Sequence, residues 1–471
     1  DEPSYTQPLM YKVIEEHPTV REQYAQALVE DGLVTPEEAA GYLDEVQERM
    51  RAAHEALKAS FGSPGGGRRE RRFGRGADVQ LDTAVSAEQL LELNERLLDV
   101  PDGFQVHPKL AKALERRRDA LGEEGGIDWA QAEGLAFASL LVEGTPVRLT
   151  GQDTERGTFS HRHIVLHDHV TGETHTPIRR LPGAKAPFQV YNSPLSEAAA
   201  LGFEYGYSVD CPRALVLWEA QFGDFVNSAQ VIVDQFIVSG LSKWGQSSRR
   251  TLLLPHGYEG NGPEHSSARL ERFMQLAAQE NVRIVNCSTA AQYFHLLRRQ
   301  ALHPKARPLV VLTPKGLLRL KQATSRRDDL AVGSFQAMID DRRLEDDQKR
   351  EIGRLVVCSG KVYYDIVGHE AYAEAEGVAV ARLEQLYPFP VAAYDELLSR
   401  YPSLSEVVWT QEEPQNMGAW RAIRHRLEEG LPAELDLRYV GRPWRASPSE
   451  GYPTAHMLEQ DRIAREALGA F

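Results

Sequence analysis

The sequence has few cysteines and no long apolar run. Three of its 471 residues are cysteine, and Cys211, Cys287 and Cys358 lie far apart without a CxxC pair. We therefore expect neither a disulfide framework nor a zinc knot, and we predict a reducing compartment. A helix needs about 20 consecutive apolar residues to span a bilayer. No such run is present, so we predict no membrane partner.

The chain also lacks an excess of positive charge. Its formal net charge is -14 and its pI is about 5.6. We predict no nucleic-acid partner, because binding to backbone phosphates favours a basic surface. This composition suits the cytoplasm, which we prefer, or the mitochondrial matrix of a eukaryote. The opening residues DEPSYTQPLMY contain no initiator Met, signal peptide or transit sequence, and we interpret the chain as a fragment or a processed product.

Residues 1–124 are predicted to be largely helical. The stretch 35–57 opens with Thr-Pro-Glu-Glu and is rich in Ala, Glu and Arg, which is typical of a helix. The Gly/Arg-rich stretch GGGRRERRFGRG at 65–76 then predicts a surface loop. An RNA-binding arm is the alternative for this stretch, although the chain around it is acidic.

From residue 128 onward, short apolar runs alternate with helical patterns. Such alternation predicts a mostly parallel sheet with helices on both faces. The expected fold class is therefore α/β, with two domains that meet near residue 325 and a helical segment before them. Strands are expected at 145–149, 213–218, 251–254, 282–285, 308–312, 355–357, 378–383, 406–410 and 437–440. Helices are expected at 195–207, 225–239, 266–279, 361–377 and 450–468.

The first candidate site is a glutamate in the aromatic segment ALGFEYGY, residues 200–207. Periodicity alone places Glu204 on the solvent face of an amphipathic helix. If it were buried instead, its pKa would rise and it would trade a proton near neutral pH. Both interpretations are open at this point.

The second candidate is the loop within LLLPHGYEGNGPEHSSARLERF, residues 252–273. An apolar strand runs into a Gly-rich loop that precedes a helix, and open α/β sheets bind ligands in this position. The loop contains two histidines, His256 and His265, and two glutamates, Glu259 and Glu264. The alternative is a surface loop whose histidines only cap or pack.

The third candidate is a histidine-rich stretch at residues 148–169. Alternate residues of one strand share a face, so a strand here would align the side chains of His161, His163, His167 and His169. A metal site is conceivable. Histidines spaced along one strand rarely converge on one ion, so we predict structural or substrate-facing histidines. Gln152, Asp153 and Arg156 lie on the preceding turn and are placed to reach a cleft.

Two further segments are predicted to be structural. EQLYPFP at 384–390 is expected to be a strand that exits into a turn, because its prolines stop the sheet. QEEPQNMGAW at 411–420 is expected to be a strand end that turns into a helix. Either segment is placed to contact a neighbouring subunit or domain. No Ser-His-Asp motif, Walker loop or GxGxxG fingerprint is convincing.

Together these motifs resemble the decarboxylating component of the thiamine-diphosphate-dependent 2-oxoglutarate dehydrogenase family. The resemblance runs from the opening residues nearly to the C-terminus, and only the Gly/Arg-rich stretch falls outside the pattern. The segments that carry it are ALGFEYGY, LWEAQFGDF, LLPHGYEGNGPEHSSARLER, CSGKVYYD, EQLYPFP, QEEPQNMGAW and GRPWRASPSEGY.

The resemblance implies two transketolase-like domains. Residues 1–124 would form a helical linker or the end of a preceding domain. Residues 125–322 would form the pyrimidine-binding domain and residues 325–471 the C-terminal domain. The family's diphosphate- and Mg²⁺-binding domain, with its GDG…N motif, has no counterpart here, so no metal ligand is expected in this chain.

The resemblance also implies roles for single residues. Glu204 would hydrogen-bond to the aminopyrimidine ring of thiamine diphosphate and so activate the cofactor. His265, in PEHSS, would transfer protons or bind substrate, and His256 is a further catalytic candidate. The other cofactor-binding candidates are Phe222, Phe225, Gln152 and Asp153.

The function implied is oxidative decarboxylation of 2-oxoglutarate in the tricarboxylic acid cycle. The succinyl group would pass to a lipoyl arm of a dihydrolipoyl succinyltransferase within a multienzyme complex, and the family forms homodimers. The alternatives are a 2-oxoadipate dehydrogenase, a 2-oxoglutarate decarboxylase or carboligase, and, from another class, a non-catalytic scaffold fragment.

Overall fold

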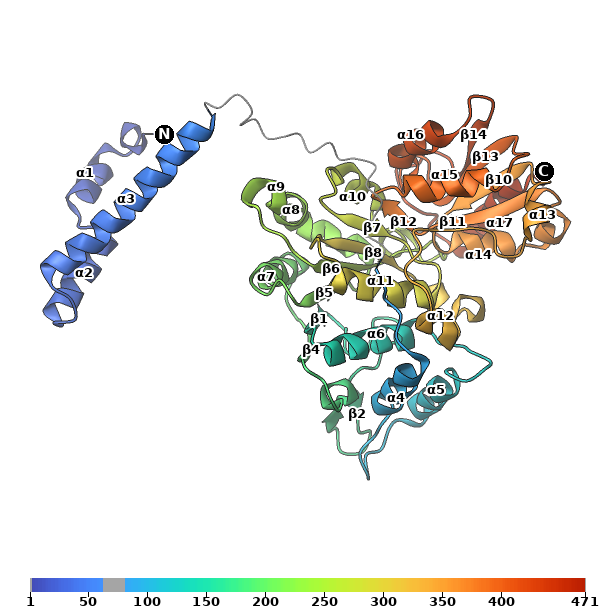
Figure 1. The fold of residues 1–471 in the computed structure, drawn as a ribbon, viewed down its shortest axis with the longest axis horizontal. Coiled ribbons are helices and arrows are strands. Elements are labelled where there is room, and N and C mark those ends of the chain that lie inside the picture. The colour runs from blue at the N-terminus through green and yellow to red at the C-terminus, as the bar shows by residue number, and fades with distance from the viewer. Residues whose placement is uncertain (1, 62–80, 471) are drawn as a thin grey trace. The chain divides into compact units, whose positions relative to one another are not determined.

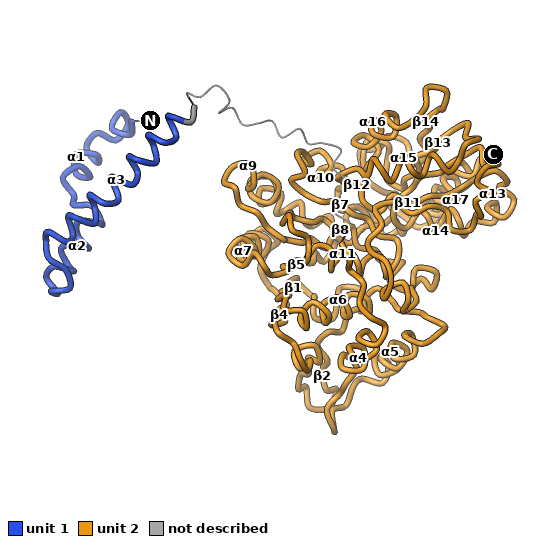
Figure 2. The backbone as a smooth tube through the Cα atoms, viewed as in Figure 1, with its two compact units in different colours: residues 1–74 blue, residues 75–471 orange. Residues whose placement is uncertain are grey.

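The computed structural model describes residues 2–61 and 81–470. Residues 1–74 and 75–471 form two compact units (Figure 2). The predicted Gly/Arg-rich loop at 65–76 lies outside the described residues. Within the described ranges, no helix combines the length and the apolarity needed to cross a bilayer.

The first unit is helical, as the sequence predicts (Figure 1). It contains η1 (Pro3–Tyr5), α1 (Pro8–Glu16), α2 (Val20–Glu30) and α3 (Pro36–Phe61). Thr19 and Glu22 form a capping box at the start of α2, which satisfies free N–H groups of its first turn. The helix predicted at 35–57 is confirmed as α3.

The second unit is built around a seven-stranded sheet in the order β12-β7-β8-β6-β5-β1-β4. All neighbours in it are parallel except β12, which runs antiparallel to β7. The strands are β1 (Val147–Gly151), β4 (Phe188–Asn192), β5 (Leu215–Glu219), β6 (Arg250–Pro255), β7 (Arg283–Val285), β8 (Leu309–Thr313) and β12 (Gln385–Tyr387). The strands expected in this region are confirmed with small shifts of their ends, β12 lies within the strand expected in EQLYPFP, and β4 had not been predicted.

Helices cover both faces of this sheet (Figure 1), as its continuous buried strands require. One face packs against α6 (Trp129–Glu143) and α11 (Ala290–Leu302). The other packs against α7 (Glu197–Asp210) and α10 (Leu270–Leu276). Before the sheet come α4 (Ala87–Leu97) and α5 (Pro108–Asp119).

A second sheet of five strands follows in the order β14-β13-β10-β11-β9. Its strands are β9 (Met338–Ile339), β10 (Arg354–Cys358), β11 (Val378–Leu383), β13 (Glu406–Pro414) and β14 (Asp436–Arg442), and only β9 is antiparallel to its neighbour. Its helices include α14 (Val362–Val367), α15 (Val391–Ser399), α16 (Trp420–Gly430) and α17 (Pro453–Leu468). One apolar core contains residues of both sheets, so the second unit packs as a whole.

Three predicted elements differ in the structure. The helix expected at 225–239 is a succession of η3 (Gly223–Ala229), α8 (Gln230–Ile232) and the π-helical η4 (Val233–Ile237). The helix expected at 361–377 is α14 followed by η8 (Glu370–Glu374). EQLYPFP does end its strand before a proline, but that strand, β12, joins the first sheet and thereby connects the two halves of the unit.

Candidate functional site

Four adjacent parallel strands, β4, β1, β5 and β6, end at the same edge of the large sheet. The carboxyl edge of an open parallel sheet is where α/β proteins bind ligands. Gln152 follows β1, Glu197 begins the helix after β4, Phe222 follows β5, and the loop with His265 follows β6. Parallel pairing therefore brings together residues that are far apart in the sequence.

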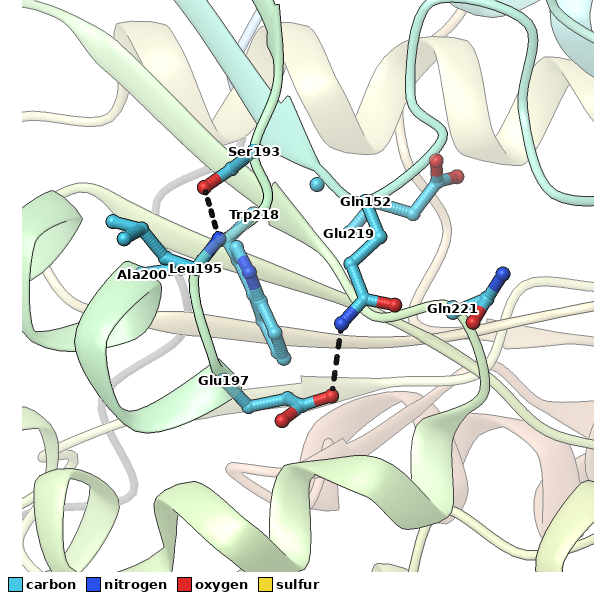
Figure 3. Close-up of a pocket in the computed structure, with 9 residues that line it drawn as sticks. Gln152, Ser193, Leu195, Glu197, Ala200, Trp218, Glu219 and Gln221 are labelled. Atoms are coloured by element: carbon cyan, nitrogen blue, oxygen red, sulfur yellow. Dashed lines mark hydrogen bonds between the residues drawn. The ribbon is translucent and has the colours of Figure 1, made fainter.

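A pocket at this edge contains a carboxylate that is held by neutral groups (Figure 3). Gln152 Nε2 donates to Glu197 Oε1 at 3.2 Å, and Ser228 Oγ donates to Glu197 Oε2 at 2.9 Å. Glu197 is half-buried in the first turn of α7, where the helix dipole favours a negative charge. The pocket is lined by Gly151, Gln152, Ser193, Leu195, Glu197, Ala200, Trp218, Glu219 and Gln221.

The second carboxylate of the pocket, Glu219, is committed to an ion pair. Arg162 donates to its two oxygens at 2.7 Å each, and the same guanidinium also pairs with Glu133. Although burial opposes its charge, Glu133 and Glu219 hold the pKa of Arg162 well above its ordinary value. Among the described residues no ion pair joins Glu197 to a cation, so Glu197 is the pocket carboxylate that is able to receive a ligand's N–H.

The predicted aromatic wall and the predicted histidine lie together beside this pocket. The ring centroids of Phe222 and His265 are 4.2 Å apart, and those of Phe225 and His265 are 6.4 Å apart. Phe225 lies on η3 with Ser228, which binds Glu197. Asp153 does not line the pocket, because it pairs with Arg156 on its own turn.

Glu204 is buried, but its partner is an arginine of the sheet. Arg148 on β1 donates to Glu204 Oε2 at 2.7 Å and to Oε1 at 2.8 Å. The rings of Tyr191, Phe203 and Tyr207 surround the guanidinium, with centroids 4.9, 5.6 and 4.6 Å away. This is a structural ion pair over the body of the sheet, so the structure argues against the aminopyrimidine-binding role predicted for Glu204.

The sequence contained a signal that points to Glu197 instead. Glu197 and Glu204 are seven residues apart, which is about two helical turns, so both lie on one helix face. The N-cap Ser196 marks Glu197 as a first-turn residue after a strand. A first turn reaches the carboxyl edge of the sheet, whereas a residue two turns later covers its middle.

His256 is also placed differently from its prediction. Its side chain is buried, Nδ1 accepts the N–H of Ala268 at 3.0 Å, and Nε2 lies 2.8 Å from Glu413 Oε1. Both ring nitrogens are therefore occupied within the protein. This arrangement contradicts a direct catalytic role, which needs a nitrogen free to meet the substrate.

The four histidines of the third candidate do not share a strand. His161 and His163 lie in a loop, and His163 has a positive φ of 51°. His167 ends the two-residue strand β2 (Leu166–His167), and His169 follows it. Burial lowers the pKa of His161 to about 3. In the part of the chain that the structure describes, no group of His, Cys, Asp or Glu is arranged to hold a metal ion.

Comparison with known proteins assigns families to both halves of the second unit. Residues 125–321 match the family model described as "Transketolase, pyrimidine binding domain". Residues 324–468 match the model described as "2-oxoglutarate dehydrogenase C-terminal".

Curated relatives agree with these matches. The chain is 48% identical over 486 residues to the 2-oxoglutarate dehydrogenase E1 component of Exiguobacterium sp., covering 99% of this chain and 49% of the relative. The corresponding proteins of Geobacillus kaustophilus and Bacillus subtilis are 48% and 47% identical, each again over 99% of this chain and 50% of the relative. The chain thus spans about half the length of the curated relatives it matches. Over 99% of its length the chain is thus similar to 2-oxoglutarate dehydrogenase E1 components, and its two halves match the family models of a transketolase pyrimidine-binding domain and of a 2-oxoglutarate dehydrogenase C-terminal region.

Proposed function

We propose that this chain supplies the aminopyrimidine-binding part of the active site of a thiamine-diphosphate-dependent 2-oxoglutarate dehydrogenase. The observation that carries the proposal is Glu197, a carboxylate without a cationic partner among the described residues. It lies at the carboxyl edge of the domain that matches the pyrimidine-binding family. This assignment replaces Glu204 with Glu197.

The residues at this edge fit a flat, nitrogen-containing heterocycle. A carboxylate held by Gln152 and Ser228 keeps lone pairs to accept a hydrogen bond from a protonated ring nitrogen. Phe222 and Phe225 present aromatic faces that pack against a planar ring and exclude water. When bound, thiamine diphosphate supplies the carbon nucleophile for the 2-oxo group and the electron sink that lets carbon dioxide leave.

Each residue then has a separate task. Glu197 binds the ring nitrogen and, by holding a proton there, sets the protonation of the ring. His265, against Phe222, donates or accepts a proton at the substrate's oxygen. The diphosphate and Mg²⁺ would be held by a domain outside this chain, and the division into residues 1–124, 125–322 and 325–471 is part of the same proposal.

The partners belong to the proposal as well. The similarity to 2-oxoglutarate dehydrogenase E1 components favours 2-oxoglutarate as substrate and transfer of the succinyl group to a lipoylated dihydrolipoyl succinyltransferase, in the cytoplasm and in the tricarboxylic acid cycle. A homodimer is supported by large apolar side chains exposed on α7, α8 and α9 (Gly240–Trp244), namely Phe203, Val231 and Trp244. Sedimentation of the chain with Phe203→Glu tests it, since a dimer built on this face would dissociate.

The proposal is tested by comparing Glu197→Ala and Glu204→Ala in the complete enzyme. We expect Glu197→Ala to lower the rate of decarboxylation by about a thousandfold and to weaken the binding of thiamine diphosphate, measured by calorimetry. Full activity in this variant would refute the proposal, because the chain would then supply no required carboxylate at this edge. Faster turnover of 2-oxoadipate than of 2-oxoglutarate by the unaltered enzyme would keep the site and change the substrate.

A further inference from the structure

The loop that carries His265, residues 256–268, is closed at its base by one buried imidazole. His256 is the first residue of this loop, and its Nδ1 accepts the N–H of Ala268, the last residue. Because Nδ1 is an acceptor, Nε2 carries the hydrogen and donates to Glu413 at 2.8 Å. One ring therefore joins both ends of the loop to β13 of the second sheet.

Two further contacts tie the same loop to its surroundings. Glu412, next to Glu413 on β13, accepts the N–H of Tyr258 at 3.1 Å. Burial opposes the charge of Glu412, but the Lys361 ammonium at 3.0 Å holds its pKa below the ordinary value. On the other side, Lys315 donates to the carbonyl oxygen of His265. The tethers thus reach the residue that the proposed function uses.

The loop needs such tethers because its own sequence gives it little rigidity. Gly260 and Gly262 have φ of 77° and 89°, a region that side-chain-bearing residues rarely adopt. No atom lies within 4 Å of the position where a Cβ of Gly262 would be. At Gly262, therefore, side-chain packing does not restrain the approach to His265, although Gly260 lies against Pro453 and His456. Hydrogen bonds at the base supply further restraint.

We propose that Glu413 and His256 are a positioning pair that fixes the His265 loop to the second sheet and thereby sets the place of His265 beside Phe222. As far as catalysis is concerned, the inference rests on the proposed function. Its structural part, that β13 holds the loop through this pair, stands independently. The pair gives the C-terminal domain a task in the site, because Glu413 lies on its strand β13, which is paired on both sides.

Hydrogen exchange of the chain by itself tests the structural part. We expect Glu413→Ala to speed the exchange of amides in residues 257–268 by about ten- to a hundredfold, as for the loss of one hydrogen bond to a charged group. Glu413→Gln keeps an acceptor for His256 and should stay near the unaltered rate. The matched control is Glu406→Ala, which removes a carboxylate at the other end of β13, where it pairs with Arg354.

Unchanged exchange in Glu413→Ala, or equal exchange in Glu406→Ala, would overturn the proposal. If Glu413→Ala does not fold, as seen by circular dichroism, His256→Gln provides the same test. That variant loses the contact with Glu413 while its amide is still able to accept from Ala268.

A double-mutant cycle in the complete enzyme tests the link to His265. If the pair acts through His265, Glu413→Ala should lower kcat about tenfold in the unaltered enzyme and leave it nearly unchanged when His265 is already alanine. Equal effects in both backgrounds would refute positioning of His265. Failure of the proposed function would appear differently, as a full rate in His265→Ala with the loop exchange still dependent on Glu413.

Discussion

Helix α7 carries two glutamates in contrasting surroundings. Glu197, in the first turn, meets the amide of Gln152 and the hydroxyl of Ser228 at the carboxyl edge of the sheet. Glu204, two turns later, is buried against Arg148 near the start of β1, away from the carboxyl edge. The comparison shows that burial alone does not mark a functional carboxylate. What distinguishes Glu197 is the lack of a cationic partner among the described residues, together with its place at the ends of the strands.

The largest effect on turnover should come from Glu197, at the carboxyl edge of the sheet. We expect Glu197→Ala to lower turnover of the complete enzyme by about a thousandfold, since it removes the group that sets the protonation of the cofactor ring. Its free energy of unfolding should change by less than about 1 kcal/mol, as for other partly exposed polar groups. Steady-state kinetics and urea unfolding measure the two quantities. A large loss of stability with only a modest loss of turnover rate would contradict the contrast between Glu197 and Glu204.

The next largest effect, on stability, should come from Glu204 in the middle of α7. Glu204→Ala leaves the Arg148 guanidinium part-buried without its partner, and we expect a loss of about 3 kcal/mol in the free energy of unfolding. Turnover of the folded protein should stay within a few-fold of normal. The control is the joint replacement Arg148→Met with Glu204→Leu, which should recover much of the loss because no unpaired charge remains. Equal instability of the single and joint variants would contradict this account.

A smaller effect concerns how the free energy of unfolding depends on pH, through the buried His161. Burial lowers the folded-state pKa of His161, which lies 4.0 Å from Glu219, from 6.5 to about 3. Below pH 6.5 the unfolded chain therefore binds a proton that the folded chain does not, so stability falls as pH falls. Between pH 7 and pH 5 this contributes about 2 kcal/mol. Urea unfolding of His161→Gln at several pH values should show a correspondingly shallower decline, and an unchanged decline would exclude His161 as the source.

The smallest effect should come from Ser228, which donates a hydrogen bond to Glu197. Ser228→Ala removes one of its two hydrogen bonds while Gln152 still holds the carboxylate, and we expect thiamine diphosphate to bind about fivefold more weakly to the complete enzyme, as for the loss of about 1 kcal/mol. The matched control is Ser239→Ala, which removes a hydroxyl that binds only the backbone of Asp234. Calorimetry compares the two variants. Equal affinities would mean that Ser228 does not orient the carboxylate.

The same contrast separates what sequence patterns predicted from what they missed. Apolar runs located the central strands, because a strand buried on both faces must be apolar throughout. The loop with His265 was also predicted, since it directly follows such a strand, whereas Phe222 and Phe225 were named from the family resemblance. Glu204 was predicted to bind the cofactor because the family resemblance implied that role, and Glu197 was not considered; the pairing of Glu204 with Arg148 on a distant strand has no local signal.

Errors in the secondary structure have a similar origin. The alternating histidines from His161 to His169 were expected on one strand, but a turn with a positive φ at His163 interrupts it. The segment 225–239 has helical periodicity, and its break into 3₁₀, α and π turns depends on packing beneath α7. Local patterns record the preference of a segment, whereas contacts from elsewhere in the chain decide between conformations of similar energy.

The sequence by itself determined the alternation of strands and helices, the family motifs and the set of residues that follow the strands, because each depends on neighbours along the chain. Only the tertiary structure decided which carboxylate is free and which is paired. It also decided that His256 holds a loop and does not face the pocket. The partners in these contacts are Arg148, Arg162 and Glu413, which lie on distant strands and loops. They matter because the charge of a buried carboxylate is governed by the groups that surround it in space.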